Sequence, residues 1–232
     1  MKLIYTLSHM PFKYGNDLYF CHSKGTATFS PPLTPFAKAH NIPPQVVEYQ
    51  PWELARYRND VIQLLPSGLE LLSPMQIFCN PVVINDVISF VYNRVLYSSP
   101  IGNDILSPST VRNNVYSGFV AENYTIYTDL KDVSSFIKIN SNGETTTTAT
   151  EFDHILRIVP WNDGLIITGQ KNQTHYTILQ YNDGSKFRLK VDGNDIYKCC
   201  LIEGNQVIHA VKTNEFETRH LHIDTVELIS DN

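Results

Sequence analysis

The sequence predicts an all-β fold, a β-propeller of four-stranded antiparallel blades, on three observations. Residues 153–192 contain four β-rich runs separated by turns. Two of these turns contain Asp-Gly, a strong hairpin signal because glycine readily takes the positive φ that tight turns require. Similar units recur about every forty residues, which is typical of propellers. The 13 tyrosines and 11 phenylalanines also favour strands.

The repeat can be measured from the second strand of each unit. These strands are expected to begin at Val87, Tyr124, Leu165 and Gln206, at intervals of 37, 41 and 41 residues. Four units then account for residues 73–232, and residues 1–72 have room for one unit with an insertion or for two short ones. We predict a single domain over residues 1–232 with five blades, and six blades is the alternative.

The first 72 residues contain the least regular part of the chain. Strands are expected over residues 2–7, 17–23 and 26–30. Residues 2–7 have no earlier partner, so we predict that they complete the sheet of the C-terminal unit and close the ring. A proline-rich insert is predicted at residues 31–57, as a long loop with a short strand at 45–49 and a short helix at 51–57.

Hydrophobic patterning places individual strands within the later units. Leu165–Ile167 is continuously apolar, which indicates an inner strand covered on both faces. Lys186–Val191 alternates between cations and apolar residues, which predicts an outer strand with one wet face. The run Thr145–Thr148 has little to bury and is also predicted to be an outer strand.

Charge and composition exclude several classes of partner. The net charge is −5, and lysine and arginine are scattered, so we expect neither nucleic acid nor an anionic membrane as a partner. The four cysteines lack zinc-site spacing and are predicted to be free thiols in a reducing compartment. There is no secretion signal, so the expected location is the cytoplasm or a virion. No cofactor fingerprint occurs, and we expect no cofactor.

One local pattern suggests an enzyme family. Residues 78–86, Phe-Cys-Asn-Pro-Val-Val-Ile-Asn-Asp, are followed by Tyr-Asn-Arg at 92–94. This stretch of 17 residues resembles the blade-opening pattern of five-bladed propeller enzymes that act on glycosides, the glycosidases and mannoside phosphorylases. The resemblance implies Asn80 and Arg94 as substrate contacts. The alternative is that Asn80-Pro81 is a turn into a buried strand.

Glycoside cleavage requires two carboxylates about 5–10 Å apart across a pocket. By position in the repeat, the candidates are Glu48, Asp86, Glu122, Asp153 and Glu203. Asp153 beside His154, directly before an inner strand, is the best placed and is the predicted catalytic pair if the protein is an enzyme. Asp86 lies instead in an Asn-Asp turn, where carboxylates serve local backbone hydrogen bonds.

Three histidines are candidate metal ligands. His220 and His222 share one face of a predicted strand, and His209 lies on the strand before. Such a group could hold zinc. The same spacing fits an exposed strand face, and no companion carboxylate is fixed by spacing, so we expect no metal.

The leading functional hypothesis is a non-catalytic binding or structural module that docks onto protein partners in a larger assembly, such as a viral (phage) particle. The insert supplies the aromatic residues Phe36, Tyr49 and Trp52, types that anchor interfaces, although they could equally cap one end of the propeller. Two alternatives remain: a glycoside-active enzyme with a site in the central channel, and a lectin-like carbohydrate binder.

Overall fold

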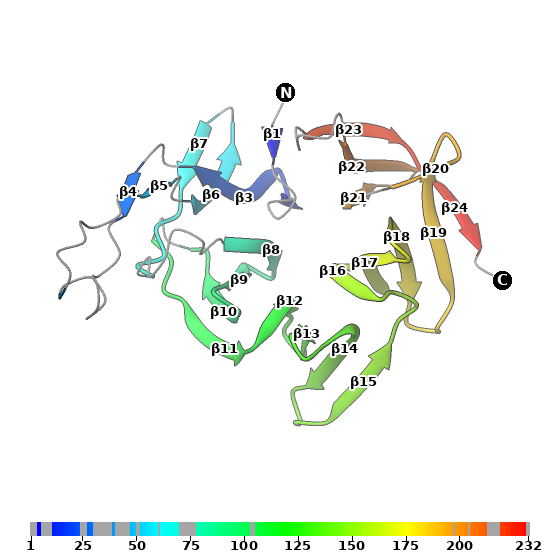
Figure 1. Cartoon of the computed structure of the whole chain (residues 1–232), viewed down its shortest axis with the longest axis horizontal. Helices are drawn as coiled ribbons and strands as arrows, with labels where there is room; N and C mark the ends of the chain where they lie inside the picture. Colours follow the sequence, from blue (N-terminus) through cyan, green and yellow to red (C-terminus); the bar gives the residue numbers. More distant parts are fainter. Residues whose placement is uncertain are drawn as a thin grey trace.

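A computed structural model of the chain describes residues 4–5, 11–23, 27–29, 39, 47–49, 52–59, 61–69, 78–102, 105–196, 198–203, 205–212 and 219–230. Within these ranges the fold consists of antiparallel sheets that stand around a ring, as Figure 1 shows. The prediction of an all-β, propeller-like fold is therefore confirmed. No helix in the described ranges has the length and apolar character needed to cross a bilayer.

The ring contains five sheets, numbered here in the chain order of their inner strands. The first sheet has the strands β2 (Phe12–Tyr14), β3 (Asp17–Ser23), β6 (Trp52–Arg58) and β7 (Val61–Leu64). The second has β8 (Phe78–Ile84), β9 (Val87–Tyr92), β10 (Val95–Pro100) and β11 (Ser109–Asn113). The third has β12 (Val115–Val120), β13 (Tyr124–Asp129), β14 (Asp132–Asn140) and β15 (Thr145–Ala149).

The fourth and fifth sheets complete the ring. The fourth is built on β16 (His154–Trp161), β17 (Gly164–Lys171), β18 (Thr174–Tyr181) and β19 (Lys186–Val191). The fifth has β21 (Lys198–Glu203), β22 (Gln206–Lys212), β23 (Arg219–Thr225) and β1 (Ile4–Tyr5). The second strands begin at Val87, Tyr124, Gly164 and Gln206, which confirms the repeat to within one residue.

The N-terminal strand β1 joins the fifth sheet, whereas the last described strand, β24 (Glu227–Ser230), belongs to the fourth. Ile4 pairs with His220 and Tyr5 with Arg219, antiparallel, so β1 is the outer strand of a sheet whose other strands come from the C-terminal part. The predicted closure of the ring by the N-terminal strand is confirmed. β21 also contacts β2 of the first sheet, which joins the last sheet to the first.

The fourth sheet differs from the prediction because it has six strands rather than four. β19 pairs with β18 and also with β20 (Asn194–Asp195) and β24 (Glu227–Ser230). The sequence predicted β19 as an outer strand, which is wrong: β24 pairs with the edge of β19 that faces away from β18. β20 lies on the same edge as β18, since Lys190 pairs with Asp195 on one side and with Glu227 on the other. In the described part of the chain, each of the other four sheets of the ring has four strands.

Four inner strands share a β-bulge close to their first residues. The bulges lie between Cys79 and Val82 in β8, between Val115 and Ser117 in β12, between Ile155 and Arg157 in β16, and between Cys199 and Leu201 in β21. A bulge leaves backbone groups outside the ladder and redirects the neighbouring side chains. In the second sheet the bulge directs the side chain of Asn80 toward Ser117 of the third sheet.

Hydrogen bonds join equivalent inner-strand positions of successive sheets. The amide Nδ2 of Asn80 donates to the Oγ of Ser117 at 3.4 Å, 37 residues later. The backbone N–H of Ile158 donates to the same Oγ at 3.2 Å, a further 41 residues along the chain. Both intervals equal the repeat intervals measured in the sequence, so the repeat aligns a buried acceptor with donors from both neighbouring sheets.

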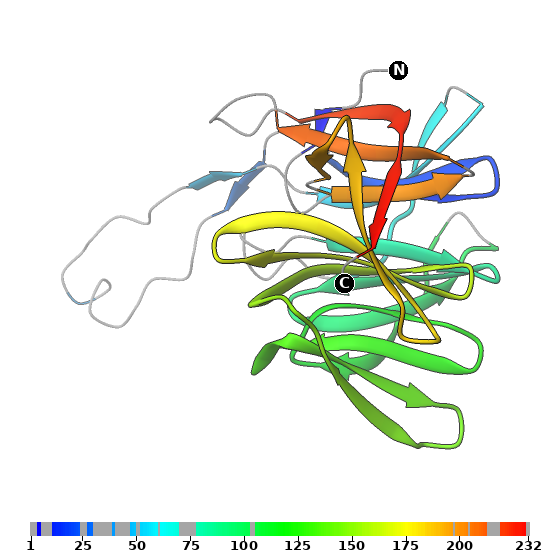
Figure 2. The ribbon, with the colours of Figure 1, turned by 90° about the vertical axis from the view of Figure 1, so that its right-hand side faces the viewer.

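The predicted insert, residues 31–57, follows β3 and overlaps β6. The helix expected at 51–57 is wrong, because Trp52–Arg58 forms β6 and pairs with both β3 and β7. β4 (Ala27–Phe29), which precedes the predicted insert, and β5 (Val47–Tyr49), which lies within it, form a two-stranded sheet of their own. Figures 1 and 2 show this hairpin extending outward from the ring.

Candidate functional site

The predicted catalytic pair lies at the start of β16. The carboxylate Oδ2 of Asp153 accepts a hydrogen bond from the backbone N–H of Asn172 at 2.7 Å and is exposed. The imidazole of His154 is half-buried and makes an edge-to-face contact with Tyr116, with ring centroids 4.9 Å apart. Asp153 therefore holds the β17–β18 turn, the role that acids in turns commonly have.

The two residues that the glycosidase resemblance singled out lie at a bulge and in a turn. Asn80 is buried at the bulge of β8 with a φ of 52°. Arg94 is exposed in the β9–β10 turn, and its carbonyl accepts from the N–H of Val115 at 2.9 Å. Within the described residues neither side chain contacts Asp153 or His154. The alternative reading of Asn80-Pro81, an entry into a buried strand, corresponds to the observed bulge.

The remaining candidate acids lie in turns or outside the described side chains. Asp86 is exposed in the β8–β9 turn, and Glu122, also exposed, accepts from Asn85 Nδ2 at 3.2 Å. The side chains of Glu48 and Glu203 lie outside the described part of the structure.

An arginine reaches across the ring. Arg157, on β16 directly after the bulge, is 1% exposed, and its Nη2 donates to the carbonyl of Pro11 at 3.1 Å. Pro11 precedes β2, and β16 and β2 belong to sheets that are not neighbours in the ring. A buried guanidinium thus occupies space between inner strands, where the enzyme hypothesis placed a substrate. Sequence reasoning missed this residue because Arg157 lies in an otherwise apolar run.

Of the three histidines, the structure describes the side chain of His209 only. Its Nε2 lies 2.7 Å from Oδ2 of Asp224, and the ring is buried. The backbones of His209 and His222 are cross-strand partners. No metal-binding group of three or more His, Cys, Asp or Glu side chains occurs among the described residues. The side chains of His220 and His222, and those of Phe36, Tyr49 and Trp52, lie outside the described residues.

A cavity of about 390 Å³ opens between the first and second sheets. Its walls come from the β2–β3 turn, the end of β6, the β8–β9 turn and the residue after β10. The N–H of Asp86 donates to the hydroxyl of Tyr14 at 3.3 Å, which links the two sheets beside the cavity. The turns hold this shape locally, because Gly15 and Asn59 both have positive φ.

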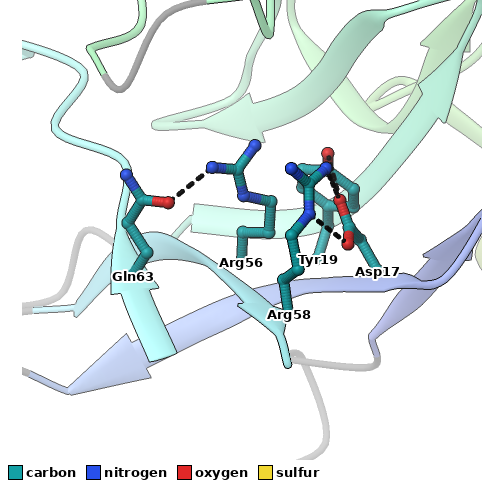
Figure 3. A network of polar contacts seen from close by, with 5 residues as sticks. All are labelled: Asp17, Tyr19, Arg56, Arg58 and Gln63. Atoms are coloured by element: carbon teal, nitrogen blue, oxygen red, sulfur yellow. Dashed lines mark hydrogen bonds and ion pairs between the residues drawn. The ribbon is translucent and has the colours of Figure 1, made fainter. Parts of the chain in front are cut away.

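An ion pair lies in the wall of this cavity. Arg58 donates from Nε to Oδ1 of Asp17 at 2.7 Å and from Nη2 to Oδ2, a two-point contact that Figure 3 shows. The hydroxyl of Tyr19 donates to Oδ2 of the same carboxylate at 3.5 Å. The Asp17 side chain is 6% exposed and that of Arg58 is 54% exposed. The carboxylate is thus held inside and the guanidinium faces the solvent.

This arrangement sets the protonation of the pair. The hydrogen bonds from Arg58 hold the pKa of Asp17 below its ordinary value, against the effect of desolvation. Burial raises the pKa of Tyr19. Arg56, two residues before Arg58 on β6, donates to Oε1 of Gln63. The cavity therefore presents a fixed, partly neutralised cation beside tyrosine and asparagine side chains, which suits a polar ligand rather than acid–base chemistry.

Sequence reasoning missed this site. Asp17 follows a glycine turn and Arg58 lies 41 residues later, beyond the insert. The two meet because Leu18 pairs with Tyr57 in the β3–β6 ladder. If residues 52–58 had been predicted as a strand beside residues 17–23, Asp17 and Arg58 would have been placed at the same end of that strand pair.

A second, smaller cavity of about 220 Å³ lies between the third and fourth sheets. One wall comes from β13, β14 and β15. The other comes from β17, β18 and the turns that precede β17 and follow β18. Its lining includes Tyr124, Lys138, Gln180 and Tyr181.

The chain was compared with known proteins. No protein-family model matches the chain. No curated protein matches it either. A solved structure described as "KlHsv2 with loop 6CD replaced by a Gly-Ser linker" aligns at 8% identity over 78% of this chain and 94% of that one. The TM-score of this alignment is 0.35, too low to support a functional inference.

Proposed function

We propose that this protein is a binding module that docks onto a partner protein through the β4–β5 hairpin, with the ring as its rigid base. The observation that carries the proposal is the position of this hairpin. The strands of the ring are joined into sheets around a closed circle, whereas β4 and β5 form a separate two-stranded sheet that extends away from it (Figure 2).

The physics of small sheets supports this role. A two-stranded sheet on its own is marginally stable in water. In the described part of the chain β4 and β5 pair with each other alone, so each strand has one edge open for a further strand. Addition of a partner strand satisfies such an edge with main-chain hydrogen bonds. We therefore expect the hairpin to be completed by a strand of the partner.

The glycoside-active alternative has less support. It requires two carboxylates that face each other across an open pocket. Asp153 is engaged by the backbone of a turn, and Arg157 lies buried between inner strands. The described residues contain no feature specific to a virus particle, so the proposal concerns a protein partner without naming the assembly.

We also propose to count the six-stranded fourth sheet as one blade with two added strands. The ring would then have five blades, which is the number that the sequence repeat favours. This count supports the propeller architecture alone and adds nothing to the resemblance to glycosidases.

The test replaces residues 24–51 with an Asn-Gly turn. Ser23 and Trp52 are cross-strand partners at the end of the β3–β6 ladder, so a two-residue turn can join them directly. We expect the ring to fold with an unchanged circular dichroism spectrum, and the variant to lose the partner that the full chain captures from its native host.

The matched control replaces the exposed β14–β15 turn, residues 141–143, with Asn-Gly, which leaves the hairpin intact. Captured proteins should be retained by this control and should then bind the full chain as purified components. A partner that binds the hairpin-deleted chain as tightly as the full chain contradicts the proposal.

A further inference from the structure

The cavity between the third and fourth sheets has the composition of a binding site for a small polar ligand. Its floor is apolar, since Ile126, Phe136 and Leu165 are all buried. Tyr124 and Tyr181 form aromatic walls. At about 220 Å³ the cavity is smaller than the pockets that hold drug-sized ligands, and it matches a ligand of one ring.

Gln180 supplies an acceptor that the protein itself does not use. Its Oε1 is buried and has no hydrogen-bond partner among the described residues. A buried acceptor without a partner is unfavourable and is uncommon in folded proteins. Gln180 lines the cavity, so a rotation of its amide toward the cavity would let a donor on a bound ligand complete this hydrogen bond.

Lys138 supplies the charge. Its Nζ lies 4.7 Å from the centroid of the Tyr124 ring, a cation–π contact that fixes the ammonium at the wall. No aspartate or glutamate lines the cavity, so its net charge is positive. The site therefore favours a ligand with a negative charge and disfavours cations.

The glycines of this region keep the wall closely packed. A Cβ on Gly164 would lie 2.4 Å from the backbone oxygen of Gln180, so only glycine allows β17 to approach β18 there. Gly184, in the β18–β19 turn, has a φ of 89°. The backbone of Gln180 at the cavity wall is therefore held in place by its close approach to β17.

We propose that this cavity binds an acidic sugar, with the carboxylate of a uronic acid at Lys138, a ring hydroxyl donating to Oε1 of Gln180, and the C–H face of the sugar against the tyrosines. A sugar ring combines the three properties that the cavity demands: a hydroxyl donor, an apolar face and, in uronic acids, a negative charge. This site is separate from the β4–β5 hairpin, and neither proposal depends on the other.

The test titrates the full chain with glucuronate and with glucose, following binding by ligand-detected NMR. Glucuronate should saturate at millimolar concentration or below and bind at least about tenfold more tightly than glucose. Replacing Lys138 with methionine should abolish that preference, and Gln180→Met should weaken both sugars. Lys131→Met is the matched control, since Lys131 is exposed in the β13–β14 turn and does not line the cavity.

Thermal melting verifies that each variant is folded before titration. The absence of saturable glucuronate binding to the folded wild-type chain overturns the proposal. So does unchanged glucuronate binding in both cavity variants, because binding would then take place elsewhere. Equal affinity for glucose and glucuronate removes the role given to Lys138 and overturns the acidic-sugar assignment.

Discussion

Arg58, the last residue of β6, holds the buried carboxylate of Asp17, the first residue of β3, through two of its donors. This pair fastens the β2–β3 turn to the end of β6 and forms one wall of the larger cavity. The carboxylate is buried and the guanidinium is partly exposed. Loss of the pair would therefore leave Asp17 with a buried charge that nothing compensates, whereas Arg58 would still be solvated.

The Asp17–Arg58 pair should make stability depend on pH in the acid range. The folded-state pKa of Asp17 lies below its ordinary value of 3.8, so its stabilisation is complete above that pH and is lost as the pH falls through the folded pKa. We expect Arg58→Met to lower the melting temperature by about 2–4 °C at pH 7. The difference from wild type should be constant down to about pH 5 and should shrink below pH 3.8.

Thermal melts at a series of pH values measure this difference. Lys131→Met, which removes an exposed lysine, serves as the control and should show no comparable trend. A wild-type advantage over Arg58→Met that persists undiminished well below pH 3.8 would contradict the assigned pair.

Ser117 should be important for the contact between neighbouring sheets. Its Oγ accepts from Asn80 and from the N–H of Ile158, and the side chain is buried. Replacing Ser117 with alanine leaves both donors without this acceptor, and we expect a loss of about 1–3 kcal/mol in the free energy of unfolding. Urea denaturation measures it. Thr146→Ala, on the exposed β15, should change stability by less than about 0.5 kcal/mol.

Gly169 should tolerate no side chain while Phe152 is in place. A Cβ at this position would lie 2.3 Å from Cγ of the Phe152 ring, which packs in the core. We expect Gly169→Ala to destabilise the protein by about 1–3 kcal/mol through overpacking.

The double variant Gly169→Ala with Phe152→Ala identifies the cause. It should be destabilised by less than the two single variants added together, because alanine lacks the Cγ and Cδ atoms that the methyl group would meet. Strict additivity in urea denaturation would show that the ring is not what excludes the methyl group.

The N-terminal strand should stabilise the opposite end of the chain. Removing residues 1–6 deletes β1 and exposes the edge of β23, where Ile4 and Tyr5 pair. We expect a lower melting temperature and faster hydrogen exchange at the backbone amides of residues 219–221 in mass spectrometry. Removal of residues 231–232 is the control. Unchanged exchange at 219–221 after the N-terminal deletion would show that β1 does not protect β23 in solution.

The repeat in the sequence was sufficient to predict much of the ring. The Asp-Gly turns and the intervals between Val87, Tyr124 and Gln206 predicted the antiparallel units, because turn chemistry and strand patterning act over a few residues. Closure by the N-terminal strand was also predictable, since a strand without a local partner must pair elsewhere. The helix at 51–57 was wrong because a short amphipathic segment fits either period, and pairing with β3 decides it.

The sites depended on contacts that no local pattern encodes. Asp17 meets Arg58 only through the β3–β6 register, and Arg157 meets Pro11 across the ring, 146 residues away in the chain. Asp153, selected for its place before an inner strand, is engaged by a turn amide that only the folded structure brings to it. The repeat and most of its strands were predictable, because turn residues and side-chain alternation act locally. The tertiary structure decided which polar side chains meet, because sheet register and ring closure set those distances.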